Sequence, residues 1–256
     1  MSTQHAVQRA LRARRYIMDA AFDLVYPAEI QRVSSRFWTP VQAAMTAACW
    51  IKASSCTSVL DVGAGVGKFC IVTSLALDHP VTGIEQRSHL VDAARRAAAQ
   101  YEAPTTFEHG TIEDVDAARF DAFYFFNPFA ENVFDADEQL DREVELSERR
   151  WFDDLALVER WLSAARDGTL VITYNGFGGR IPGSYRLVRR TFVAGNWLRA
   201  WVKSSSEPAP EAFHIEVDDM VFSSAELGAA GKRCSPPMGS ERLQALLERP
   251  LGLPLR

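Results

Sequence analysis

The central part of the chain alternates short apolar runs with segments in which apolar residues recur at helical spacing. Such alternation is typical of a doubly wound α/β fold, in which parallel strands are joined by crossover helices. The nearly unbroken apolar run over residues 120–126 favours a central strand that is covered on both faces. The five predicted strands cover residues 58–62, 80–84, 105–108, 120–126 and 169–174. The predicted helices cover residues 66–77, 88–101 and 147–165.

Helical patterns also precede this core. From residue 7 to about residue 30, apolar positions recur roughly at helical spacing, and Pro27 marks a break near the end of this lead-in. A second helix is predicted over residues 41–52, with Thr39 as its N-cap and Pro40 at its first position.

Two further strands are predicted after the core. Segments 185–193 and 197–203 favour an antiparallel hairpin at the sheet edge, although the first segment could be helical. Together with the five core strands they give a Rossmann-like, mostly parallel seven-stranded sheet with an N-terminal helical extension. Beyond Ser204 the composition turns to Ser, Pro, Glu and Gly. This predicts a loosely packed tail with one helical candidate, residues 240–247.

Composition narrows the class of protein. The 256 residues are 47% hydrophobic, enough to bury one large core, so we expect one domain with extensions. The net charge of -5 argues mildly against a partner whose many phosphates must be neutralised, as in a nucleic acid. An arginine cluster near the N-terminus is more often the solvated face of a helix; it comprises Arg9, Arg12, Arg14 and Arg15.

The cysteine pattern and the apolar stretches indicate what to expect of metal binding, disulfides and cellular location. The four cysteines show no C-x-x-C spacing and no cluster with the five histidines, so we expect neither a metal nor a disulfide framework. The apolar stretch over residues 41–51 is too short to span a bilayer. The first forty residues lack the order of a secretion signal or a transit peptide, so we expect a cytoplasmic location without a membrane partner.

A glycine-rich turn follows the first predicted strand. That strand ends in Asp61, and Gly63, Gly65 and Gly67 then lead into a helix. Glycines allow the backbone to approach a ligand closely at the carboxyl edge of the sheet, where doubly wound folds bind ligands. The turn is therefore a predicted ligand-binding loop.

The glycine spacing excludes two common phosphate-binding loops. The dinucleotide fingerprint would need a glycine at Lys68. The P-loop would need a glycine at Val62 and a hydroxyl residue at Phe69. We therefore interpret Lys68 as a lysine on the helix surface.

The glycine turn belongs to a longer segment, Val59-Leu60-Asp61-Val62-Gly63-Ala64-Gly65-Val66-Gly67-Lys68-Phe69, which resembles the first motif of class I S-adenosylmethionine-dependent methyltransferases. The resemblance implies that the cofactor, S-adenosylmethionine, lies against Asp61, Gly63, Ala64, Gly65 and Gly67. A second sign is Glu85, at the tip of the second predicted strand; Glu85 and the following Gln86 are expected to bind the cofactor. A carboxylate at Glu85 can accept hydrogen bonds from both ribose hydroxyls.

The resemblance also implies where adenine is bound. In this family an acidic or amide residue after the third strand often holds the adenine amino group, and Thr111 stands at that position here. Backbone groups around Thr111 and Ile112 are therefore expected to bind the adenine amino group, with the Ile112 side chain against the adenine ring. Asp114 is a weaker candidate for binding adenine. His109 suits a surface position as well as a site position.

The fourth predicted strand ends in Asn127-Pro128-Phe129, which resembles the Asn-Pro-Pro-aromatic motif of methyltransferases that modify planar nitrogens. The resemblance implies that Asn127 and Pro128 orient the target atom next to the cofactor and that Phe129 stacks on the acceptor. This chain lacks the second proline of the motif. Alternatively, Asn127 and Pro128 simply shape a turn beneath the cofactor.

Two further features concern a lid over the site and a general base. Trp38, in a segment that resembles the lid of several family members, could cover the cofactor or belong to the core. Methyl transfer needs a general base only for a protonated nucleophile. Candidates for a base are Glu131, Asp114 and Tyr174.

The resemblance covers roughly residues 36–203 and divides the chain into three parts. Residues 1–52 form the helical extension and lid, residues 53–204 the S-adenosylmethionine-binding methyltransferase domain, and residues 205–256 the tail. The expected acceptor is a small molecule or a protein side chain, with nitrogen as the expected atom and nucleic acid disfavoured. The loop and lead-in look most like lysine methyltransferases of the type first found regulating telomeric silencing. The competing hypothesis is a non-catalytic S-adenosylmethionine-binding regulatory module.

Overall fold

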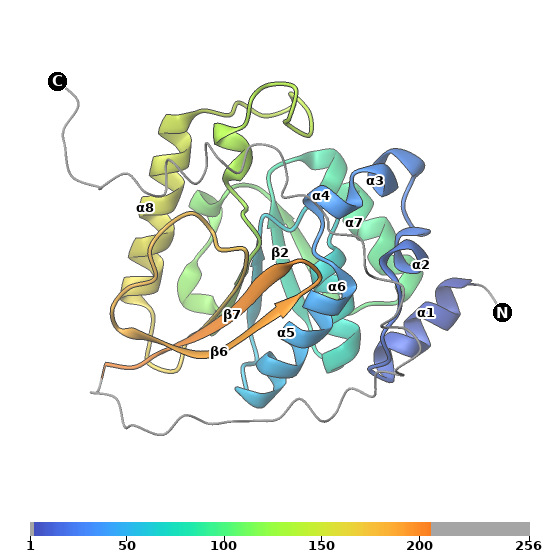
Figure 1. Ribbon diagram of the computed structural model, residues 1–256, viewed down its shortest axis with the longest axis horizontal. Helices are drawn as coiled ribbons and strands as arrows, with labels where there is room; N and C mark the ends of the chain where they lie inside the picture. The colour runs from blue at the N-terminus through green and yellow to red at the C-terminus, as the bar shows by residue number, and fades with distance from the viewer. Residues whose placement is uncertain (1–2, 206–256) are drawn as a thin grey trace.

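A seven-stranded sheet forms the centre of the molecule in the computed structural model, which describes residues 3–205 (Figure 1). The strand order is β3-β2-β1-β4-β5-β7-β6. Strands β1 to β5 run parallel, and β7 pairs antiparallel with both β5 and β6. The predicted mostly parallel, Rossmann-like sheet is therefore confirmed. The strands are β1 (Val59–Val62), β2 (Val81–Glu85), β3 (Thr105–His109), β4 (Ala122–Phe125), β5 (Leu170–Tyr174), β6 (Tyr185–Val193) and β7 (Asn196–Lys203).

Alternate residues along the central strands point to opposite faces, and each face packs against its own layer. On β4, Tyr124 lies in one core cluster, and Phe123 and Phe125 lie in the other. Helices α5, α6 and α7 cover the first face together with the N-terminal segment, and α8 covers the second (Figure 1). These helices are α5 (Val41–Ala53), α6 (Lys68–Leu77), α7 (Ser88–Tyr101) and α8 (Glu148–Ala164). Three short 3-10 helices lie between them: η1 (Ile112–Asp114), η2 (Ala117–Arg119) and η3 (Ala130–Val133).

The later part of the chain follows its predicted pattern. The hairpin is confirmed, since β6 and β7 pair along their length and turn at Ala194 and Gly195. The predicted tail and its helical candidate, residues 240–247, lie outside the described residues. Among residues 3–205, no helix combines the length and the apolar character that crossing a bilayer requires.

The N-terminal lead-in is helical, but it consists of short pieces. Pro27 directly precedes one of them, as the predicted break requires. These helices are α1 (Thr3–Arg12), α2 (Asp19–Asp23), α3 (Ala28–Arg32) and α4 (Ser34–Phe37).

The predicted cap of the next helix is wrong. The N-cap of α5 is Pro40, and the hydroxyl of Thr39 bonds instead with that of Tyr124 at 3.0 Å. The first amide of α5, that of Val41, donates to the carboxylate of Asp19 at 2.8 Å. A residue from the N-terminal segment therefore satisfies the helix end that a local cap would otherwise serve.

The prediction that Lys68 lies on a helix surface is also wrong. Its side chain is 2% exposed, and its Nζ lies 2.6 Å from Asp19 and 2.8 Å from Asp23. Nζ also donates to the hydroxyl of Ser34 at 3.2 Å. A buried ammonium group needs such opposite charges and hydrogen bonds. Lys68 thus ties the N-terminal segment to the helix that follows the glycine turn.

Candidate functional site

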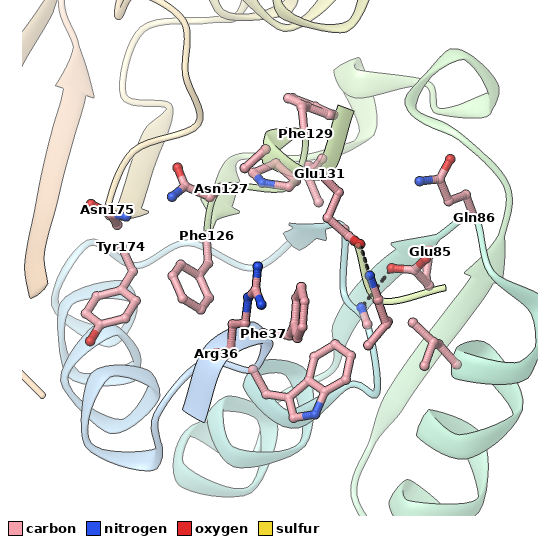
Figure 2. Close-up of a pocket in the computed structure, with 18 of the residues that line it drawn as sticks. Arg36, Phe37, Glu85, Gln86, Phe126, Asn127, Phe129, Glu131, Tyr174 and Asn175 are labelled. Atoms are coloured by element: carbon pink, nitrogen blue, oxygen red, sulfur yellow. Dashed lines mark hydrogen bonds between the residues drawn. The ribbon is translucent and has the colours of Figure 1, made fainter. Parts of the chain in front are cut away.

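A cavity of about 670 Å³ opens at the carboxyl ends of β1, β2, β4 and β5 (Figure 2). This volume is typical of small-molecule sites, and the place is where doubly wound folds bind ligands. Among the residues proposed from the sequence, the cavity is lined by Trp38, Gly63, Gly65, Glu85, Gln86, Thr111, Ile112, Asn127, Pro128 and Phe129. The structure therefore brings together ten candidate residues from segments far apart in the sequence.

The glycine turn permits close packing that a larger residue would prevent. Gly63 has φ +73°, and a Cβ there would lie 2.7 Å from Cβ of Pro128. Gly65 has φ +54°, and a Cβ there would lie 2.5 Å from the ring of Trp38. Trp38 is buried, and its Nε1 donates to the carbonyl of Ile30 at 3.2 Å. Trp38 therefore packs on the loop and belongs to the core, which is one of the two alternatives from the sequence; that it covers the cofactor stays a prediction.

Glu85 faces the same turn. Its Oε2 accepts a hydrogen bond from the amide of Gly65 at 3.0 Å, and its Oε1 accepts one from the amide of Arg87 at 2.9 Å. Burial raises the pKa of this carboxyl. The expected convergence of the glycine turn and this carboxylate is thus direct. Each carboxylate oxygen keeps a second lone pair, which can accept a bond from a ribose hydroxyl.

Three residues that the resemblance placed at the cofactor do not line this cavity: Asp61, Ala64 and Gly67. Asp61 is buried below the turn, where its Oδ2 accepts a bond from the thiol of Cys70 at 3.3 Å. Burial raises the pKa of Asp61 to about 7. A Cβ at Gly67 would lie 2.4 Å from the ring of Phe107. Asp61 and Gly67 therefore support the loop from beneath.

Ile112, which is expected to lie against the adenine ring, is buried and lines the cavity wall. The amide of Thr111, however, donates to Oδ2 of Asp114 at 2.8 Å, and the Thr111 hydroxyl accepts a bond from the amide of Glu113 at 3.3 Å. Asp114 is thereby engaged in capping η1. Asp114 as an adenine ligand stays a prediction. His109 is exposed, and its ring is bonded to the carbonyl of Gln86.

Two asparagines stand where β4 and β5 end, and both have left-handed backbone conformations. Asn127 has φ +44° and Asn175 has φ +60°. The amide of Asn127 donates to the carbonyl of Gly176 at 3.0 Å, which joins the two loops. Both residues line the cavity (Figure 2), and within residues 3–205 neither side-chain amide makes a hydrogen bond. Strained residues with unused polar groups are typical of functional sites.

The aromatic wall differs from the motif-based assignment. Phe129 touches the cavity but is mostly buried against the α8 side of the core. Phe126 is only partly buried and packs on Tyr174, with 4.9 Å between the ring centroids. Phe126 and Phe37 both line the cavity near Asn127 (Figure 2). Sequence reasoning missed these two rings, although both lie in segments that it had singled out.

The three candidate bases are already engaged. Glu131 pairs with Arg87 at 3.1 Å and accepts a bond from the amide of Leu140 at 2.7 Å. The hydroxyl of Tyr174 donates to the carbonyls of Val193 and Ala194, and burial raises the pKa of Tyr174 to about 12. Asp114 caps η1, as described above. These three groups are therefore all held by contacts within the protein, and Asp154 is a further carboxylate in the cavity wall.

Comparison with known proteins agrees with this geometry. Residues 59–144 match the family model described as a methyltransferase domain. The fold is similar to an O-methyltransferase from Bacillus cereus in complex with S-adenosylhomocysteine, at 15% identity and TM-score 0.51 over 77% of this chain and 97% of that one. It is similar to a proposed O-methyltransferase from Klebsiella pneumoniae, at 16% identity and TM-score 0.50 over 78% and 97%. No curated protein matches the sequence.

Proposed function

We propose that this chain is a class I S-adenosylmethionine-dependent methyltransferase that methylates a small planar acceptor held beside Asn127, with nitrogen as the atom modified. The observation that carries this proposal is the unused side-chain amide of Asn127, which lines the cavity close to the glycine turn. A carboxamide oxygen can accept a bond from an N–H of the acceptor and so orient its lone pair.

The residues present fit the cofactor. Gly63 and Gly65 line the cavity with backbone atoms alone, and Glu85 can receive the ribose. Bound S-adenosylmethionine supplies a methyl group on a sulfonium leaving group. The protein then has to hold the acceptor atom in line with the methyl group and the sulfonium sulfur, at short distance. Such alignment can supply much of the acceleration of methyl transfer.

The kind of acceptor follows from the cavity wall. The rings of Phe37 and Phe126 offer apolar surface to a flat molecule, and Asn127 and Asn175 offer amides. Because the three candidate bases are engaged, the acceptor is expected to present a lone pair that needs no prior deprotonation, such as that of a neutral amine. The proton left on the product can go to water. A cavity of about 670 Å³ favours a small molecule over a protein side chain.

The test is a cell extract incubated with purified protein and methyl-labelled cofactor, followed by mass spectrometry of both the small-molecule and the protein fractions. Label in a small, nitrogen-methylated product supports the proposal, whereas label confined to proteins, or on oxygen, contradicts it. Asn127→Ala should lower product formation at least about tenfold and leave cofactor affinity within about twofold. Asn127→Ala protein that labels as fast as the wild type would also contradict the role given to this amide.

A further inference from the structure

One cationic side chain in the cavity takes no part in the proposed function. Arg36, the third residue of the short helix α4, lines the cavity, and Figure 2 shows its guanidinium projecting into it. It carries five N–H donors on a permanently charged, planar group. Arg36 is two residues before Trp38, whose ring packs on Gly65.

The other cavity arginines are engaged by protein groups. Arg87 pairs with Glu131 at 3.1 Å and with Asp141 at 2.9 Å. Arg150 donates to the side chain of Gln86. The side chain of Arg36, by contrast, makes no hydrogen bond within residues 3–205, and its one ion pair, with Glu138, spans 3.8 Å. That distance is beyond a hydrogen bond, so the donors of Arg36 remain available.

Aromatic rings hold the Arg36 guanidinium in place. Its Cζ lies 5.1 Å from the centroid of the Phe37 ring and 5.6 Å from that of Phe134. Stacking on rings orients a guanidinium without using its in-plane N–H groups. Those groups form a fork that matches the two oxygens of a carboxylate.

We propose that Arg36 is the carboxylate-binding residue of this cavity. The inference rests on the proposed function, since the ligand is the acceptor or the cofactor of that reaction. A carboxylate can come from an acidic planar acceptor, whose ring would lie among Phe37, Phe126 and Tyr174, or from the amino-acid end of the cofactor. Both sources share the same chemistry, a bidentate ion pair with the Arg36 guanidinium.

Calorimetry with defined probes separates the two sources. S-adenosylhomocysteine carries the amino-acid carboxylate, and 5′-methylthioadenosine lacks it. If the cofactor is the source, Arg36→Met should weaken S-adenosylhomocysteine binding by about tenfold to a hundredfold, the range for a lost charged hydrogen-bond pair. Binding of 5′-methylthioadenosine should then stay within about twofold of the wild type.

The acceptor is tested on protein saturated with S-adenosylhomocysteine. Anthranilate, an aromatic amine with a carboxylate, is compared with the uncharged 2-aminobenzamide. If the acceptor is the source, wild-type protein should prefer anthranilate at least about tenfold, and Arg36→Met should abolish the preference. Arg36→Lys keeps the charge but loses the fork, so an intermediate loss is expected.

A matched control is Arg149→Met, because the Arg149 side chain is 91% exposed and does not line the cavity. It should change neither comparison. The inference is overturned if Arg36→Met leaves both comparisons as in the wild type, or if the wild type binds S-adenosylhomocysteine but prefers neither carboxylate-bearing probe. A wild-type protein that does not bind S-adenosylhomocysteine at all would instead overturn the proposed function.

Discussion

At the scale of single residues, Glu85 connects the structure of the glycine turn with its proposed use. Its two oxygens face two backbone amides, those of Gly65 and Arg87. A carboxamide could accept only one of these bonds and would direct its NH₂ group at the other amide. Glu85→Gln is therefore not a neutral change here, and the turn depends on the carboxylate itself.

We expect both Glu85→Ala and Glu85→Gln to weaken S-adenosylhomocysteine binding by at least about tenfold, because each removes charge-assisted hydrogen bonds. Isothermal titration calorimetry measures this loss, and circular dichroism checks that the variants fold. The control is Glu148→Gln, at the exposed start of α8. Wild-type affinity in the Glu85 variants would contradict the assignment of the ribose to this carboxylate.

Asp61 gives a prediction about pH. Its pKa is raised from 3.8 to about 7 by burial, so the folded protein holds a proton that the unfolded chain has lost. Stability therefore falls as pH rises from about 4 through about 7 and then levels off. Glu85, whose pKa is also raised by burial, contributes in the same direction. Asp61→Asn should reduce this loss of stability by a few kcal/mol, which is the order of magnitude that a pKa shift of this size corresponds to.

Urea unfolding of the cofactor-free protein at pH 5.5, 7 and 8.5, pH values chosen to bracket a pKa of about 7, measures the effect of Asp61→Asn. The variant should gain stability relative to the wild type as pH rises. A constant difference between the two proteins across this range would show that Asp61 does not titrate there.

At the scale of elements, the N-terminal segment and the glycine turn are one unit. Lys68, at the start of α6, holds Asp19 and Asp23 of α2, and Tyr26 donates to the carbonyl of Val66 at 2.9 Å. Asp19 in turn accepts a bond from the first amide of α5. The segment that places Trp38 over the turn is thus fixed by charges buried beneath it.

Lys68→Met should leave Asp23 buried without its partner and destabilise the protein by about 3 to 5 kcal/mol. The double variant Lys68→Met with Asp23→Leu removes both charges and should recover much of that loss. Denaturant unfolding measures the stability, and limited proteolysis of residues 13–40 follows the N-terminal segment. A single variant as stable as the wild type would show that the buried ion pairs do not hold this segment.

At the scale of the whole molecule, the parts predictable from the sequence are those that follow from local patterns or from the general topology of parallel sheets. The strands and α7 follow from apolar periodicity, and the convergence of Gly65 and Glu85 follows from the topology of parallel strands. The surface position predicted for Lys68 was wrong because its partners lie 45 and 49 positions upstream. Hydrophobic periodicity gives no information about contacts between such distant residues. Glu131 was proposed as a base for the same reason, since its partner Arg87 is far away in sequence.

Binding of a ligand in the cavity should also raise the thermal stability of the whole fold. A ligand that binds only the folded state adds about 2.7 kcal/mol at one hundred times its dissociation constant. For a chain of this size, each kcal/mol raises the Tm by about 2 to 4 °C, so S-adenosylhomocysteine should raise it by roughly 5 to 10 °C. Differential scanning fluorimetry at several ligand concentrations measures the shift. Glu85→Ala should reduce this Tm shift at equal ligand concentration, because the dissociation constant of the variant is expected to be higher.

A wild-type Tm that stays constant at saturating S-adenosylhomocysteine would contradict cofactor binding itself. A normal shift without labelled product would point instead to binding without turnover, so the two measurements separate the cavity as a binding site from the cavity as a catalyst.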